Sequence, residues 1–172
     1  MRNILNGRND MNEIIKLKDV QEFKTYDPIL VLNEDIYSDN HFCVLNTNRG
    51  NIAFSYYDLG VAPSFLVQNE ILFLNFGQSA YVIDLSKSQL LYRSNNISDI
   101  IFEIVKVDKK SCILFIGELS LLCFNLKGQL IWKNSYRNSI YDWKIDEDGI
   151  SVIFESEDKI LVLYENGNGV TQ

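Results

Sequence analysis

The sequence predicts an all-β fold built from a tandem series of short antiparallel meanders. Three observations support it: short apolar runs recur along the chain, tight-turn signals separate them, and the resulting segments align as internal repeats. The chain has 172 residues, 47% hydrophobic and 23% charged, which excludes disordered, collagen-like and disulfide-scaffold proteins. No apolar run approaches the roughly 18 residues of a membrane span, and the first residues lack the hydrophobic block of a secretory signal. We therefore expect one all-β domain over residues 1–172.

The repeats at residues 71–95, 112–135 and 150–169 share an apolar run, a tight turn and a second apolar run, and the first two add another turn and a third strand. One more short strand precedes each of them, at residues 64–67, 100–107 and 140–145. Each unit therefore reads as a four-stranded antiparallel meander, and the three repeats cover about 62–96, 100–136 and 140–172.

Glycines mark the turns between the predicted strands. Gly77-Gln78 and Gly117-Glu118 place glycine first in a two-residue loop, as a type II′ hairpin requires. Lys127-Gly128 and Arg49-Gly50 place glycine where a positive φ is needed.

The three cysteines have no CxxC spacing and are odd in number, which favours a reducing compartment and hence the cytoplasm. Each lies in an apolar run, so we expect Cys43, Cys112 and Cys123 to be buried. With Gly117-Glu118 as the loop, Cys112 lies opposite Cys123 in a wide, hydrogen-bonded pair, which argues against a disulfide.

The first third of the chain fits the same template, as a repeat over about 20–57. Its predicted strands are residues 20–26, 28–32, 41–46 and 51–57, with an acidic insert at 33–40 between the second and the third. The last repeat ends without a convincing fourth strand, whereas residues 13–19 form an unassigned strand-like segment. We therefore expect this N-terminal strand to complete the last blade, as in circular propellers. A helix over residues 12–24 is the alternative, because Ile14, Leu17 and Val20 recur every three residues.

Continuous apolar runs indicate sheets that are buried on both faces, whereas a two-layer sandwich would show cleaner alternation. Blades around an axis provide neighbours on both sides, so the prediction is a propeller-like arrangement of about four four-stranded meanders. An open or half-propeller stack is the alternative to a closed ring. Residues 123–135 and 81–95 resemble the repeats of quinoprotein-like (PQQ-type) propellers, with matches at Asp84, Gly128 and Trp132. The resemblance implies blade geometry, and no quinone or calcium constellation accompanies it, so no cofactor is expected.

Negative charge is concentrated near the C-terminus. The net charge is −7, and residues 140–172 contain eight acids against two lysines. A second acidic run lies in the insert, at Glu34, Asp35 and Asp39. Such a chain repels nucleic acid and anionic membranes and attracts a basic protein. The alternative is that these acids are solvated loop residues that keep a β-rich protein soluble.

The sequence contains no recognisable catalytic or metal site. The single histidine, His41, lacks further ligands at metal spacing, and no partner completes a nucleophilic pair with Cys43. Phosphate-binding and acyl-transfer motifs are absent, and Asp142, Asp146 and Asp148 lack the spacing of a calcium loop. We therefore expect a non-enzymatic protein without a metal.

Aromatic residues beside the acids complete a predicted partner-binding surface, because aromatic side chains anchor and carboxylates steer. The predicted surface consists of Glu34, Asp35, Tyr37, Asp39, Tyr141, Asp142, Trp143, Asp146, Glu147, Asp148, Glu155, Glu157 and Asp158. In small size and acidic character the chain is similar to immunity proteins of bacterial toxin systems, which implies a cytoplasmic inhibitor of a basic, nuclease-like toxin. A generic propeller-like interaction module and a small-ligand binder are the alternatives.

Overall fold

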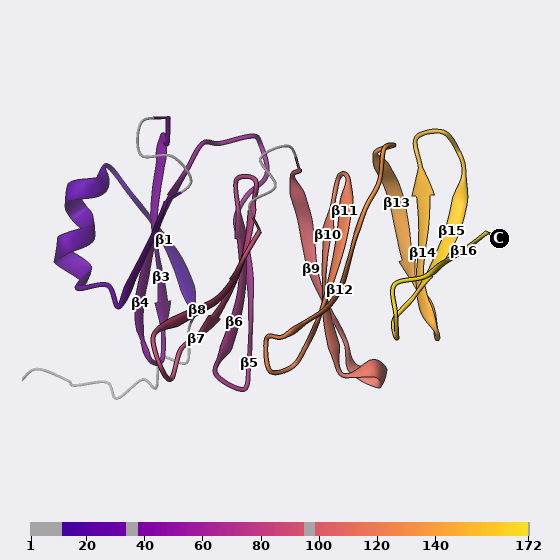
Figure 1. Cartoon of the computed structure of the whole chain (residues 1–172). Coiled ribbons are helices and arrows are strands. Elements are labelled where there is room, and N and C mark those ends of the chain that lie inside the picture. The colour runs from indigo at the N-terminus through magenta and orange to yellow at the C-terminus, as the bar shows by residue number, and fades with distance from the viewer. Residues whose placement is uncertain (1–11, 34–37, 95–98, 172) are drawn as a thin grey trace, which may run out of the picture. The chain divides into compact units, whose positions relative to one another are not determined.

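The computed structural model describes residues 12–33, 38–94 and 99–171 and confirms the all-β fold class. Sixteen strands and two short 3-10 helices are present in these residues, and the strands form four four-stranded sheets (Figure 1). The chain divides into two compact units, Met1–Tyr57 and Asp58–Gln172. That residues 1–172 form a single domain stays a prediction.

The N-terminal unit contains one sheet with the strand order β1-β3-β4-β2. Its strands are β1 Glu13–Leu17, β2 Leu30–Asn33, β3 His41–Thr47 and β4 Gly50–Tyr56. The strands β1, β3 and β4 are antiparallel, but β2 runs parallel to β4. The first sheet is therefore not the simple meander that the sequence predicts.

Residues 13–17 form the predicted N-terminal strand, but the prediction that it completes the last blade is wrong. Strand β1 pairs with β3 of its own sheet, from Glu13 opposite Asn46 to Leu17 opposite Phe42. The last sheet has its own fourth strand, β16 (Gly169–Thr171), which the sequence analysis missed. This strand has three residues and all of them are exposed, so it shows no hydrophobic alternation.

The segment predicted as a strand at 20–26 is instead the 3-10 helix η1 (Val20–Tyr26). Asp19 causes the change, because its Oδ1 accepts hydrogen bonds from the backbone amides of Gln21 (2.8 Å) and Glu22 (3.3 Å). The buried ring of Phe23 then packs edge-on against Phe42, with the ring centroids 6.3 Å apart. The alternative of a helix over residues 12–24 is correct only from Val20 onward.

The C-terminal unit consists of three consecutive antiparallel meanders, each a four-stranded sheet in chain order. The first sheet contains β5 Ser64–Gln68, β6 Ile71–Phe76, β7 Ser79–Asp84 and β8 Gln89–Arg93. The second contains β9 Ile101–Val107, β10 Cys112–Gly117, β11 Ser120–Asn125 and β12 Leu130–Ser135, with the short helix η2 (Asp108–Lys110) between β9 and β10. The third contains β13 Ile140–Ile145, β14 Gly149–Phe154, β15 Lys159–Leu163 and β16.

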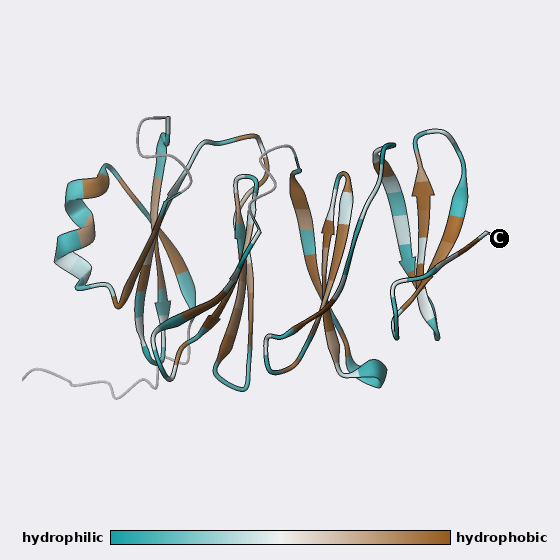
Figure 2. Cartoon of the chain, viewed as in Figure 1, coloured by the Kyte–Doolittle hydropathy of each residue, from teal (hydrophilic) through white to brown (hydrophobic). Residues whose placement is uncertain are grey.

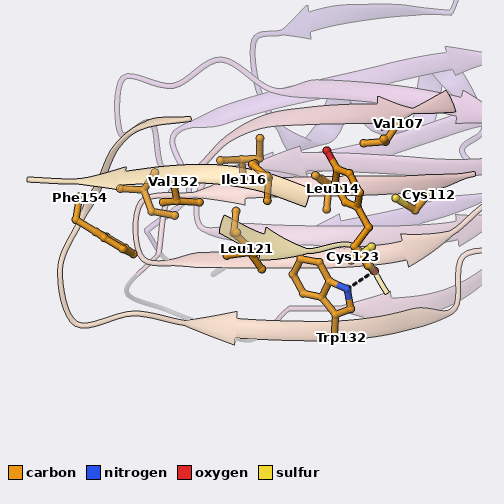
Figure 3. Packing of buried hydrophobic residues seen from close by; sticks show 13 residues of the cluster. Val107, Cys112, Leu114, Ile116, Leu121, Cys123, Trp132, Val152 and Phe154 are labelled. Atoms are coloured by element: carbon orange, nitrogen blue, oxygen red, sulfur yellow. Dashed lines mark hydrogen bonds between the residues drawn. The ribbon is translucent and has the colours of Figure 1, made fainter. Parts of the chain in front are cut away.

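The three sheets of the C-terminal unit stack face to face, as propeller blades do. Phe73 of the first sheet packs against Phe115 and Phe124 of the second, with ring centroids 6.2 and 6.1 Å apart. Between the second and third sheets lie Leu114, Cys123 and Trp132 together with Val152 and Phe154 (Figure 3). Full burial of each such aliphatic or aromatic side chain stabilises the fold by about 1.5–3 kcal/mol.

The two central strands of the middle sheet are buried on both faces, as their continuous apolar runs predict. All six residues of β10 are buried, and so is β11 from Ser120 to Phe124. Figure 2 shows the apolar residues concentrated in the central strands and the hydrophilic residues at the turns. In the last sheet, by contrast, Ile150, Val152 and Phe154 of β14 are buried while Ser151 and Ile153 between them are partly exposed. The last sheet therefore has one buried face and one outer face.

The turn predicted at Gly117-Glu118 is longer than two residues. Ile116 pairs with Leu121, and Cys112 therefore lies opposite Asn125 rather than Cys123. The buried carboxylate of Asp99 sets this register, because it accepts hydrogen bonds from Leu119 N (2.7 Å) and from the Ser120 hydroxyl. The other predicted hairpin is correct: Phe76 pairs with Ser79 around Gly77-Gln78.

All three cysteines are buried free thiols, as predicted. Cys112 and Cys123 occupy diagonal positions on adjacent strands, since Cys123 pairs with Leu114. The interaction between the two thiols lowers the pKa of Cys112 and raises that of Cys123.

Candidate functional site

The outer face of the last sheet is the candidate site, because most of the predicted surface residues surround it. Strand pairing places Ile153, Ser151, Leu161, Asp142 and Lys144 on this face, opposite the buried residues. The face thus combines a partly exposed aliphatic centre with charged side chains around it. This combination is typical of surfaces that bind a protein partner reversibly.

Two open hollows of about 600 and 720 Å³ lie on this face, and a third of about 650 Å³ lies at its β14–β15 end, where Tyr136, Phe154 and Ile160 of the inner side line it. All three are lined by Lys159 at the start of β15, and two of them by Ile153 and Asp142. Nine of the predicted surface residues line the hollows: Tyr141, Asp142, Trp143, Asp146, Glu147, Asp148, Glu155, Glu157 and Asp158. The structure therefore gathers the predicted C-terminal residues around one sheet.

The acids at the turn between β13 and β14 are largely engaged within the protein. Asp146 accepts a hydrogen bond from the Ser151 hydroxyl (2.5 Å) and forms an ion pair with Lys144 (3.0 Å). The Ser151 hydrogen bond and the Lys144 contact lower the pKa of Asp146. Asp148 forms an ion pair with Lys110 of the neighbouring sheet, with 3.3 Å between Oδ1 and Nζ. Lys144, two residues from Asp146, and Lys110, 38 residues from Asp148, neutralise much of the predicted negative charge at this end.

Asp142 and its neighbours belong to strand β13, at the edge of the sheet. The carboxylate of Asp142 accepts a hydrogen bond from the backbone amide of Trp143 (2.8 Å), and so covers a donor of the edge strand. The Trp143 ring is parallel to that of Phe102, with the centroids 6.3 Å apart. Tyr141 lies at an irregularity in the pairing and is 75% exposed. It is the most exposed aromatic anchor that the described residues offer at this face.

The second acidic turn lies at the opposite end of β14. Glu155, Glu157 and Asp158 are exposed, and Asp158 accepts a hydrogen bond from the Ser156 hydroxyl (2.9 Å). Among the described residues, Glu155 and Glu157 take part in no ion pair. Since β14 has six residues, the two acidic turns are about 20 Å apart. The predicted acids therefore form two groups, and the group at 155–158 is the more available one.

The remaining predicted residues do not join this site. Glu34, Asp35 and Tyr37 lie outside the described residues. Asp39 belongs to the N-terminal unit, where it accepts a hydrogen bond from the buried Ser55 hydroxyl (2.6 Å). Its carboxylate thus has a structural partner.

The aliphatic centre of the site is not part of the predicted surface. Ile153 and Leu161 lie in apolar runs, which predict burial for them as for their neighbours. The signal that could have identified them is the polar Ser151 between two apolar residues, which marks a half-exposed strand. Tyr136 lies in a loop, but its ring is not an exposed anchor of this site, because it packs edge-on against Phe154, with the centroids 5.1 Å apart.

The structure adds no catalytic or metal constellation in its described part. Among those residues, no group of three or more His, Cys, Asp or Glu could hold a metal ion. Burial raises the pKa of the Cys43 thiol to about 11, so Cys43 is protonated at neutral pH. The Nδ1 atom of His41 lies 2.8 Å from Asn40 Oδ1, and the ring lies against that of Tyr56. In the same residues, no helix has the length and hydropathy needed to span a membrane.

Comparisons with known proteins place the chain in no family. No protein-family model and no curated protein matches it. Among solved structures, BamB from Moraxella catarrhalis is similar over 74% of this chain and 44% of BamB, at 12% identity and a TM-score of 0.47. Hsv2 from Kluyveromyces lactis (64% and 35%) and PorZ of Porphyromonas gingivalis (76% and 20%) are 16% and 12% identical, each with a TM-score of 0.38. The chain spans less than half the length of each of these three, and the likenesses carry no argument beyond the sheets described above.

Proposed function

We propose that the chain is a non-enzymatic protein-interaction module that binds its partner on the outer face of the last sheet. The observation that carries the proposal is that eight predicted surface residues line the two hollows that contain the partly exposed Ile153. Tyr141 supplies an exposed aromatic anchor, and Ile153 and Leu161 supply apolar area. Anchors of this type in a polar surround account for most of the affinity at protein interfaces.

The finer proposal is that the partner is basic and that the chain inhibits it, as an immunity-type protein inhibits a nuclease-like toxin. Glu155 and Glu157 favour this version, because they are exposed and have no cationic partner among the described residues. Such carboxylates accelerate association with a cationic surface.

The test first asks whether a reading frame beside this chain encodes a basic toxin domain. If it does, association rates between the purified domain and this chain are measured at rising salt concentration. We expect the double variant Glu155→Gln and Glu157→Gln to slow association, and salt to remove most of the difference. The matched control is Glu13→Gln with Asp27→Asn, which changes the net charge equally in the N-terminal unit. Equal effects of the two pairs would overturn the proposed basic interface. Unchanged binding by Tyr141→Ala would overturn the proposed face itself.

A further inference from the structure

The fourth strands of the first two sheets in the C-terminal unit carry an unusual charge for so acidic a protein. Residues 85–94 and 126–138 contain five lysines and arginines and no aspartate or glutamate, whereas the whole chain has a net charge of −7. These residues comprise β8 and β12 with the segments that flank them. We call these two segments, residues 85–94 and 126–138, the basic edge. Net charge conceals it, because the surplus acids lie elsewhere.

Both strands of the basic edge also expose aliphatic side chains. Four of them are 39–46% exposed: Leu90, Leu91, Leu130 and Ile131. The two strands share an irregularity, because each pairing register shifts by one residue, at Leu91 in β8 and at Ile131 in β12. Such bulges leave the extra residue unpaired and turn it outward at a sheet edge.

The two strands are neighbours in space as well as equivalent in sequence. Each is the outermost strand of its sheet, and the two sheets share the buried cluster that contains Phe73 and Phe124. The turn before β12 approaches β8 directly, since a methyl group on Gly128 would lie 3.0 Å from Leu91 Cδ1. Because stacked sheets are about 10 Å apart, one extended ligand segment can reach both edges.

The cations of the basic edge differ in how they are engaged. Lys87 forms an ion pair with Asp84 (3.0 Å), and the Arg93 guanidinium lies 5.5 Å from the centroid of the Tyr81 ring. Lys127 and Lys133 of the β12 side are exposed and form no ion pair with any described residue. These two lysines are therefore available to an external anion.

We propose that the basic edge is a second interaction surface, which binds an acidic protein segment with interspersed aliphatic side chains. Carboxylates of the segment would contact Lys127 and Lys133, and its aliphatic residues would cover Ile131 and Leu91. A linear segment contacts only this local surface, whereas an anionic membrane faces the whole molecule and its net charge of −7. Charge complementarity therefore favours a protein segment over a lipid surface. This proposal is independent of the site on the last sheet.

The test is fluorescence anisotropy with a short labelled peptide of alternating aspartate and leucine, and with its lysine–leucine counterpart as a specificity control. We expect the wild-type chain to bind the acidic peptide and the double variant Lys127→Glu with Lys133→Glu to bind it about tenfold more weakly. The matched control is Lys16→Glu with Lys24→Glu, which changes the net charge equally at exposed positions of the N-terminal unit and should leave binding unchanged. Ile131→Ser should weaken binding, whereas Val20→Ser, at a similarly exposed position, should not.

Three results would overturn the proposal. These are no binding of the acidic peptide by the wild-type chain, equal losses of affinity for it in the two double lysine variants, and binding of the lysine–leucine peptide by the wild-type chain as tight as that of the acidic one. Sedimentation with phosphatidylcholine–phosphatidylserine vesicles addresses the lipid alternative. Lysine-dependent sedimentation without peptide binding would assign the basic edge to a membrane instead. Thermal unfolding of every variant confirms that the losses do not reflect misfolding.

Discussion

Removal of the Asp99 carboxylate should destabilise the protein more than most single substitutions. Asp99 is 1% exposed and accepts hydrogen bonds from Leu119 N (2.7 Å) and from the Ser120 hydroxyl. Hydrogen bonds to a charged group contribute about 1.5–3 kcal/mol each, so Asp99→Ala should lower the free energy of unfolding by about 3–5 kcal/mol. In Asp99→Asn the amide oxygen can still accept from Leu119, and the amide group can donate to the Ser120 oxygen. We expect that variant to lose only about 1 kcal/mol.

The loss should also reach the last sheet, because the turn held by Asp99 connects to it. The Ile140 amide donates to the Glu118 carbonyl (2.7 Å), and the Tyr136 amide donates to the Leu119 carbonyl (2.8 Å). Urea unfolding followed by circular dichroism measures the stability, and hydrogen exchange at Ile140 reports the coupling. A loss below about 1 kcal/mol in Asp99→Ala, or equal losses in the alanine and asparagine variants, would refute the proposed role of the carboxylate.

Two further predictions concern a turn and a buried hydroxyl. In a urea titration, Gly128→Ala should lower the free energy of unfolding more than Gly60→Ala does. Both glycines have positive φ (79° and 84°), but only the methyl group at 128 would meet a neighbour, Val82 Cγ1 at 2.8 Å. Equal losses of stability in the two variants would contradict this prediction. Burial raises the pKa of Tyr164 to about 12 from its ordinary value near 10, so its stabilising contribution is complete below pH 10 and is lost as the pH rises towards 12. The free energy of unfolding of Tyr164→Phe should therefore fall less steeply between pH 10 and 12 than that of the wild type, and parallel curves would disprove the assignment.

The sequence predicted the strands and several turns, because those features depend on local properties. Continuous apolar runs require burial on both faces, and β10 and β11 have it. Glycine tolerates positive φ, and Gly77 and Gly128 adopt it in their hairpins. The burial of the cysteines followed from the same apolar runs.

The candidate site could be predicted only in part. The residues around the last sheet are close in sequence, so their proximity followed from the repeat that contains them. The charge of this surface could not be predicted in the same way, because Lys110, from the helix η2 of the neighbouring repeat, forms an ion pair with Asp148. The sequence does not predict the basic edge for a related reason. Leu91 and Ile131 lie in apolar runs that predict burial, whereas in the structure both lie at register shifts and are exposed.

The sequence alone therefore determined the fold class, the strand segments and the surplus of negative charge, since hydrophobic period, turn chemistry and composition are properties of neighbouring residues. Tertiary structure decided which strand pairs with which. Asp19 caps the helix η1, which follows β1 in the N-terminal unit. Asp99, which lies before β9, accepts a hydrogen bond from Leu119 in the turn between β10 and β11 and so sets the pairing of these two strands. Tertiary structure likewise decided which charges remain available. Hydrogen bonds and ion pairs between distant residues set both outcomes, and a local pattern contains no information about distant partners.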